Sequence, residues 1–164
     1  MFILSLYLLF AMVMVMAVDL TRYTIPNWLV GSVLVAYPVM AYLSPVPVDW
    51  QGALMAIGIC FAVGYILFLK KWMGGGDIKL IIVISLWMGM EHLLDFLFLM
   101  TIIGGVFSVI LLVGRKLLAG VLTTQKVAEL PRVLKPGAPV PYGVAIASSF
   151  IYMMWKGQVP GIGI

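Results

Sequence analysis

The side chains that could carry out acid–base, nucleophilic or metal chemistry in this chain are few, and most of them are carboxylic acids. The sequence holds one cysteine, Cys60, and one histidine, His92. An intrachain disulfide, a CxxC zinc site and a multi-histidine metal site are therefore excluded. The carboxylates are Asp19, Asp49, Asp77, Glu91, Asp95 and Glu129. Catalysis by titrating side chains would accordingly use carboxyl groups, and we expect neither a metal nor an organic cofactor.

Two of these carboxylates stand out because each borders a long apolar stretch. Asp19 closes the first apolar run and begins the segment DLTRYTIPN, and Asp77 follows three glycines in GGGDIKL. A carboxylate at the edge of a hydrocarbon layer is costly and by default suggests a function. Two neighbouring carboxyl groups share a proton, so that one can act as a general base while the other acts as a general acid.

Each aspartate also has a purely structural interpretation. Asp77 is a suitable N-cap for the helix that follows it, and Asp19 could pair with Arg22 on the next helical turn. The glycines Gly74, Gly75 and Gly76 favour a functional interpretation. A segment without side chains lets another backbone, such as that of a peptide substrate, approach the neighbouring carboxylate closely.

Two turns that contain proline accompany the aspartates. Pro26 restricts the residue before it to an extended conformation and so ends the first helix. Asn27 is then predicted to cap the second helix, in a tight turn that fixes Asp19. The segment PGAPVPYGVA predicts an irregular entrance to the last helix, and it contains Pro141, Tyr142 and Gly143.

The composition indicates a membrane protein. Of the 164 residues, 64% are hydrophobic and 10% are charged, whereas soluble domains have about 25% charged residues. Apolar runs between charges and Pro/Gly breaks predict an all-α, polytopic membrane protein that forms a single domain over 1–164. We expect about six transmembrane helices, at 2–20, 27–43, 52–70, 77–90, 93–114 and 139–156, and a cytoplasmic loop at 115–138.

The basic residues predict the orientation in the membrane. Every Lys and Arg except Lys156 falls in or beside the loops that follow the first, third and fifth predicted helices. The positive-inside rule places these loops in the cytoplasm and both termini outside it. All five tryptophans fall near predicted helix ends, as in an interfacial belt. The net charge of +4 needs no nucleic-acid partner to explain it.

This orientation also bears on the proton shared by the two aspartates. The first helix ends at the cytoplasmic face with Asp19, and the fourth helix begins there with Asp77. A helix N-terminus favours a carboxylate and a C-terminus disfavours one. The helix dipoles therefore predict that Asp77 is the ionised base and that Asp19 is its protonated partner.

Taken together, DLTRYTIPN from Asp19, GGGDIKL from Gly74 and PYGVA from Pro141 resemble motifs of a known family. The chain resembles the bacterial type IV prepilin peptidases, specifically the short CpaA/TadV-like branch associated with Flp (Tad) pili. The resemblance implies an intramembrane GxGD aspartic endopeptidase of the inner (cytoplasmic) membrane, with Asp19 and Asp77 as its catalytic pair. The residues that would support catalysis or substrate approach are Gly74, Gly75, Gly76, Lys79, Pro26, Asn27, Pro141, Tyr142 and Gly143.

The resemblance also implies the substrates. These are prepilins and pseudopilins in the membrane, whose short basic leader is removed at the cytoplasmic face for pilus biogenesis. The single cysteine and the lack of a long loop between the first two helices imply no zinc and no N-methyltransferase activity. From the residues alone, a small proton- or cation-coupled transporter or channel component that uses Asp19 and Asp77 is the alternative. A non-catalytic secretion subunit is a third possibility.

Overall fold

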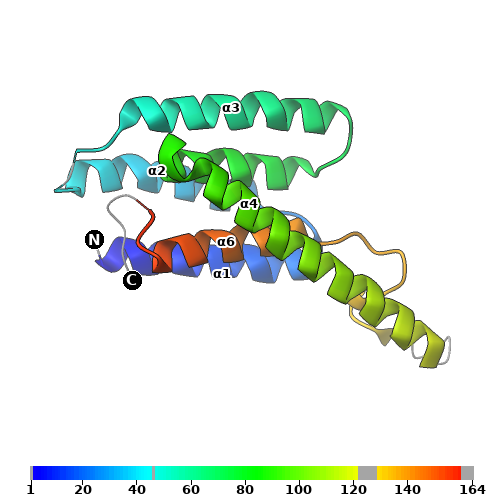
Figure 1. Ribbon diagram of the computed structural model, residues 1–164. Helices are drawn as coiled ribbons and strands as arrows, with labels where there is room; N and C mark the ends of the chain where they lie inside the picture. The colour runs from blue at the N-terminus through cyan, green and yellow to red at the C-terminus, as the bar shows by residue number, and fades with distance from the viewer. Residues whose placement is uncertain (1, 46, 122–128, 160–164) are drawn as a thin grey trace.

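The computed structural model describes residues 2–45, 47–121 and 129–159, and within these ranges it is built from α-helices (Figure 1). The predicted all-α class is confirmed for this part of the chain. The helices are α1 Phe2–Arg22, α2 Asn27–Leu43, α3 Trp50–Leu69, α4 Gly75–Val121 and α6 Tyr142–Trp155, with a short 3-10 turn, η1, at Arg132–Leu134.

The predicted fourth and fifth helices form one element, α4, that is interrupted at a different point from the expected one. The interruption was predicted at Glu91 and His92, but these residues are helical. The non-helical residue is Gly89, with φ 59° and ψ −174°. This backbone conformation is open to glycine and strained for other residues, so the glycine, and not the charges, ends the first arm of α4.

The loop predicted at 115–138 begins later than expected. α4 continues through Arg115 to Val121, and residues 122–128 lie outside the described ranges. The prediction took the charged pair Arg115 and Lys116 as the end of a helix, but neither residue opposes helix formation. Arg115 is buried, with 5% of its surface exposed, and is not a solvated loop residue.

The last helix begins three residues later than predicted, at Tyr142 and not at 139. The reason lies in Pro139 and Pro141. A residue that precedes proline is pushed out of the helical region, so Val140 stays outside the helix. Pro141 occupies the N-cap position of α6, and its side chain makes no capping hydrogen bond to the helix.

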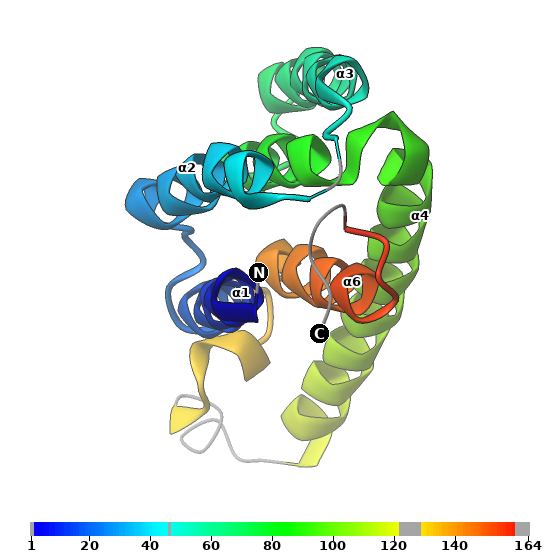
Figure 2. The same ribbon diagram turned by 90° about the vertical axis from the view of Figure 1, so that its left-hand side faces the viewer.

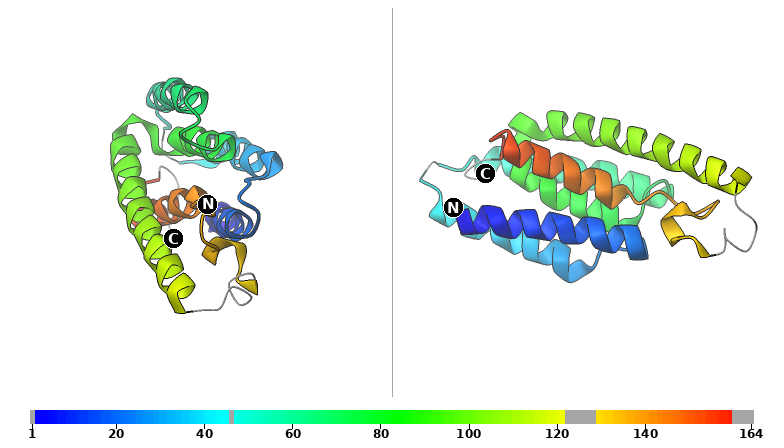
Figure 3. Two further views of the ribbon diagram at one scale, coloured as in Figure 1. Left: turned by 90° about the vertical axis from the view of Figure 1, so that its right-hand side faces the viewer. Right: turned by 90° about the horizontal axis from the view of Figure 1, so that it is seen from below.

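Successive helical segments run in alternating directions (Figure 1). α1 and α3 end, and α4 and α6 begin, at one end of the bundle, while the start of α1 and the end of α6 lie at the other end. The right-hand view of Figure 3 shows α6 lying between α1 and the second arm of α4, and α6 contacts both helices. This arrangement brings the ends of four helical segments together.

The first arm of α4, from Gly75 to the break at Gly89, is the central helix of the bundle. It packs below α3 and beside α2 (Figure 2). This arm is buried on nearly every face. Its buried residues are Ile78, Leu80, Ile81, Val83, Ile84, Ser85, Leu86, Trp87 and Met88. A helix that is apolar all round is one enclosed by other helices, so the arm can be short.

Trp87 corrects the predicted tryptophan belt. Four tryptophans are exposed, namely Trp28, Trp50, Trp72 and Trp155, as expected of residues at a membrane surface. Trp87 is fully buried. Its ring packs edge-on against Tyr37, and its Nε1–H donates to the Val33 carbonyl oxygen at 3.2 Å. This residue belongs to the core and is not an interfacial anchor.

Three helices, α1, α3 and α4, are long and apolar enough to cross a membrane. α2 and α6 are also apolar but have only 17 and 14 residues. Large apolar side chains are exposed along the helices, as expected for surfaces that face lipid. The chain therefore has the character of a membrane protein. Six spans and extracytoplasmic termini stay predictions.

We expect Gly89→Ala to destabilise the protein by about 1–3 kcal/mol, because a side chain strains a backbone with φ 59°. An added Cβ would meet nothing within 4 Å, so the effect would come from the backbone alone. Thermal unfolding in nanodiscs would measure it. Gly114→Ala in the same helix, where an added Cβ also meets nothing within 4 Å, is the control. Equal unfolding temperatures for the two variants would contradict the role given to Gly89.

Candidate active site

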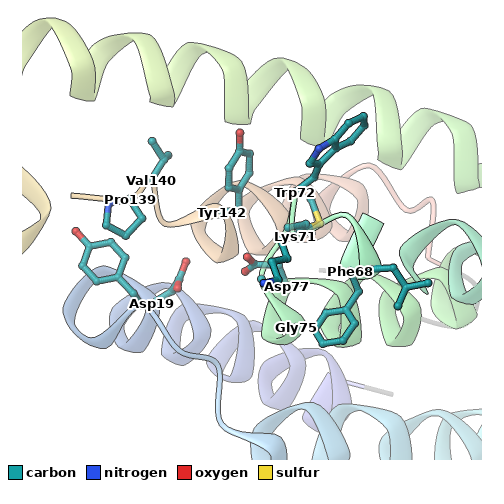
Figure 4. A pocket seen from close by; sticks show the side chains of 13 residues that line it. Asp19, Phe68, Lys71, Trp72, Gly75, Asp77, Pro139, Val140 and Tyr142 are labelled. Carbon is teal, nitrogen blue, oxygen red and sulfur yellow. The ribbon is translucent and has the colours of Figure 1, made fainter. Parts of the chain in front are cut away.

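Asp19 and Asp77 line the same cavity, of about 710 Å³, at the end of the bundle where four helical segments meet (Figure 4). α1 contributes Asp19 and the first turn of α4 contributes Asp77. The remaining wall comes from the end of α1, the connection between α3 and α4, and the entrance to α6. Its residues are Tyr23, Phe68, Leu69, Lys71, Trp72, Met73, Gly74, Gly75, Pro139, Val140 and Tyr142.

A second cavity, of about 250 Å³, is lined by the same two aspartates. The turn between α1 and α2 and all three glycines of GGGD also line it. Both aspartates therefore belong to the lining of two cavities. No Cα atom of α1 lies within 8 Å of a Cα atom of α4, so the two carboxyl groups face a shared space from separate backbones.

The Asp19 side chain is buried and bound to the start of α6. Only 4% of Asp19 is exposed, and its Oδ2 accepts a hydrogen bond from the Gly143 N–H at 2.7 Å. The Val144 N–H adds a second backbone interaction. The first N–H groups of a helix have no partner within the helix, so Asp19 supplies from α1 the cap that α6 lacks. The described structure contains no Asp19–Arg22 ion pair, the alternative that the sequence left open.

Gly143 allows this approach because it has no side chain. A Cβ built on Gly143 would lie 2.7 Å from Asp19 Oδ2 and 2.9 Å from its Cγ. Real Cβ atoms do not approach other atoms this closely, so Asp19 or the start of α6 would have to move. The PYG sequence is therefore more than an irregular helix entrance, because its glycine is the contact point for Asp19.

Asp77 has a different environment from Asp19. It is half-buried in the first turn of α4, which begins at Gly75. Asp77 is therefore not the N-cap that the structural interpretation proposed. In the described structure no hydrogen bond joins its carboxyl group to that of Asp19, and Figure 4 shows the two side chains apart, with space between them. The space between them leaves both groups able to contact a bound molecule.

The turn between α1 and α2 docks directly on the GGGD segment. A Cβ on Gly76 would lie 3.3 Å from both the N and the Cβ of Ile25. The Lys79 Nζ donates to Asn27 Oδ1 at 3.1 Å. The prediction that Asn27 caps α2 is therefore wrong. Pro26 occupies the N-cap position, and the Asn27 side chain instead ties the start of α2 to the first arm of α4.

A family model described as the type IV leader peptidase family matches residues 6–109. This range covers more than half of the 164 residues and includes Asp19 and Asp77. The chain belongs to the type IV leader peptidase family. Neither a curated protein nor a solved structure matches the chain.

Membership of the leader peptidase family confirms the resemblance drawn from the motifs. The matched range ends before Pro141, so the PYG motif joins the other two motifs on structural grounds, through the Asp19–Gly143 hydrogen bond. The described residues contain no group of three or more His, Cys, Asp and Glu side chains that could hold a metal ion. The expectation of a peptidase that uses no metal stays a prediction.

Two of the residues that line the cavity of this leader peptidase and that the sequence did not predict as site residues have an unusual backbone conformation. Tyr23 and Lys71 have positive φ angles of 55° and 56°, and they follow the C-terminal ends of α1 and α3. The Tyr23 N–H donates to the Asp19 carbonyl oxygen at 3.0 Å, which closes the last turn of α1. Helices often end with a left-handed residue, but it is usually glycine. The sequence therefore carried no signal for either position.

We expect Gly143→Ala to destabilise this leader peptidase by about 1–3 kcal/mol, the cost of leaving a buried acceptor without its partner. The added methyl group would occupy the space of the Asp19 carboxyl group. Thermal unfolding in nanodiscs would measure the change. Gly105→Ala, where an added Cβ meets nothing within 4 Å, is the control. A Gly143→Ala variant as stable as this control would contradict the tight packing of Asp19.

Proposed function

We propose that the chain is an aspartic leader peptidase in which Asp19 and Asp77 form the catalytic pair. The observation that carries this proposal is the placement of both carboxyl groups on one cavity in a member of the leader peptidase family. Family membership also favours a peptidase over the transporter that the residues alone allowed. Pro26, Asn27, Lys79 and the glycines support the pair by fixing the first turn of α4 against the turn between α1 and α2.

The proposed reaction is the hydrolysis of a peptide bond held between the two carboxyl groups. The ionised aspartate takes a proton from a water molecule, whose oxygen attacks the scissile carbonyl carbon. The protonated aspartate donates a proton to the carbonyl oxygen. The aspartate that took the proton from water then gives it to the leaving nitrogen as the C–N bond breaks. A hydroxyl group of the tetrahedral intermediate returns its proton to the other aspartate, which leaves a carboxyl terminus on the leader, a new amino terminus on the pilin and both aspartates in their starting states.

We assign the ionised role to Asp19, which reverses the assignment made from the sequence. That prediction weighed the dipole of the helix that carries each aspartate, together with Arg22 and Lys79, and did not include α6. Asp19 also faces the N-terminus of α6, where the Gly143 N–H donates to its Oδ2. Backbone N–H groups at a helix N-terminus favour a negative charge. Asp77 has no such donor in the described structure and is the proposed proton donor.

The proposed location is the cytoplasmic face of a bacterial inner membrane, in a multi-pass chain. The end of the bundle that carries the aspartates also carries basic residues. Arg22 ends α1, Lys70 and Lys71 follow α3, Lys79 near the start of α4 binds Asn27, and Arg132 in η1 lies over the Tyr23 ring. Lys156 lies beyond the end of α6, at the opposite end. Such an asymmetry is typical of a cytoplasmic face. A substrate whose leader lies in the cytoplasm would meet the catalytic pair at this surface.

The proposed substrates are Flp-type prepilins and pseudopilins, which join a short basic leader to a hydrophobic helix. The motifs DLTRYTIPN, GGGDIKL and PYG support this choice through the resemblance that they carry. The cavity beside Asp19 and Asp77 supports it by its size, since about 710 Å³ is enough for several residues of an extended peptide. N-methylation of the product and a zinc requirement are not expected.

Asp19→Asn and Asp77→Asn should each lower leader removal by at least about 100-fold, the usual contribution of general acid–base catalysis. Asparagine keeps the size of the side chain and an acceptor oxygen for the Gly143 N–H, but it cannot exchange a proton. Co-expression with a Flp-type prepilin, scored by gel shift and N-terminal sequencing, would measure cleavage.

The matched controls for these two variants are Asp49→Asn and Asp95→Asn. Asp49 caps α3 by accepting a hydrogen bond from the Gly52 N–H at 2.9 Å, a role that asparagine also fulfils. Asp95 lies on the second arm of α4, close to the reversal at Gly89. Both controls should cleave at nearly the normal rate. Normal cleavage by either Asp19→Asn or Asp77→Asn would refute the catalytic pair.

Gly76→Val should lower cleavage by about tenfold or more, because its side chain would push the Ile25 backbone away from the first turn of α4. The sequence suggested only that the glycines of GGGD admit a substrate backbone, whereas the structure shows that Gly76 packs against Ile25. Gly58→Val is the control, since an added Cβ there meets nothing within 4 Å. Equal cleavage by the two variants would mean that the contact between this turn and GGGD is not needed for cleavage.

A further inference from the structure

A buried arginine holds the segment that leads into α6. The Arg115 guanidinium donates three hydrogen bonds to backbone carbonyl oxygens: from Nε to Val133 at 2.9 Å, from Nη1 to Ala138 at 2.6 Å and from Nη2 to Pro139 at 2.9 Å. Only 5% of Arg115 is exposed. Its partners in the described structure are carbonyl groups and not carboxylates, so its role there is to organise backbone.

The segment that Arg115 binds forms part of the wall of the proposed active site. Pro139 and Val140 line the larger cavity together with Asp19. Neither proline beside Val140 has an N–H group, and the described structure records no hydrogen bond from the Val140 N–H. Residues 139–141 therefore donate no backbone hydrogen bond in the described structure, and the Arg115 guanidinium holds the chain just before them, at the Ala138 and Pro139 carbonyl oxygens.

The same segment sets the position of the amide that binds Asp19. Gly143 follows Pro139 by four residues, and its N–H donates to Asp19 Oδ2. Arg115 also binds η1 through Val133, and the Arg132 guanidinium in η1 lies over the Tyr23 ring at 5.8 Å. Arg115 is therefore connected to the end of α1 by two routes, one through α6 and one through η1.

We propose that Arg115 is a positioning residue, which fixes the cavity wall at Pro139 and Val140 and through it the amide that holds Asp19. This inference rests on the proposed function, because it gives Asp19 a catalytic role. An arginine suits the task since its planar guanidinium presents several N–H groups in fixed directions. Lysine has one compact ammonium group and cannot span three carbonyl oxygens in the same way.

The test combines prepilin cleavage with hydrogen–deuterium exchange of the full-length chain in nanodiscs. Arg115→Gln should lower kcat by about tenfold or more, with a smaller change in KM. Arg115→Lys should fall between this variant and the unmodified chain. Lys116→Gln, at the exposed neighbouring position, is the control and should behave as the unmodified chain does.

Exchange separates a positioning role from a general stabilising one. In Arg115→Gln, amides in residues 140–145 should exchange faster while those in residues 78–88, in the first arm of α4, keep their protection. Unchanged exchange in residues 140–145 would overturn the proposal. Faster exchange in both regions would also overturn it, since Arg115 would then stabilise the whole fold. Faster exchange in residues 140–145 with a normal kcat would show that the wall does not position the catalytic group.

A second variant keeps the proposal testable if Arg115→Gln does not accumulate. Gly137 has φ 77° and an added Cβ there meets nothing within 4 Å, so Gly137→Ala strains the segment while Arg115 stays intact. It should show the same local exchange and the same fall in kcat, and normal values of both would overturn the proposal. A chain that cleaves no prepilin would refute the proposed function, and the exchange measurement would still decide the role of Arg115.

Discussion

The hydrogen bond from the Gly143 N–H to the Asp19 carboxyl group, at 2.7 Å, joins two helices that lie 124 residues apart in the chain. It caps α6, which has no cap of its own, and it holds in place a polar side chain that is 4% exposed. A buried carboxyl group requires partners. This requirement brings the end of α1 to the start of α6, and the larger cavity lies where these ends meet the first turn of α4.

Close backbone approach is the second constraint on the site. Gly76 faces the backbone of Ile25, and Gly143 faces the side chain of Asp19, each at a distance that leaves no room for a Cβ without movement. The three sequence motifs thus contact one another in pairs: the turn after α1 with GGGD, and Asp19 with PYG. The glycines serve the packing of protein on protein, in addition to any access that they give to a substrate.

Packing against other helices also explains why the first arm of α4 can be short. At about 20 Å, a helix of this length is too short to cross a hydrocarbon core of about 30 Å by itself. It does not need to face lipid, because α2, α3 and α6 pack around it. Trp87 anchors its far end through Tyr37 and the Val33 carbonyl. Enclosure by other helices replaces hydrophobic matching to the membrane and holds Asp77 at the cavity.

The sequence by itself determined the helical class and most helix bounds, and it singled out two aspartates that the structure places on one cavity, because apolar runs, prolines and charges are local signals. α2 was predicted at its observed bounds, 27–43. Local signals failed where a distant partner decides the outcome. Arg115 was predicted to lie in a loop, but the structure shows it bound to three carbonyl groups. Trp87 was predicted to lie at the membrane interface, but other helices bury it. The partners of Asn27 and Asp19 also lie far along the chain. Only the tertiary structure could supply these contacts, because a side chain's hydrogen bonds and burial depend on which helices pack beside it.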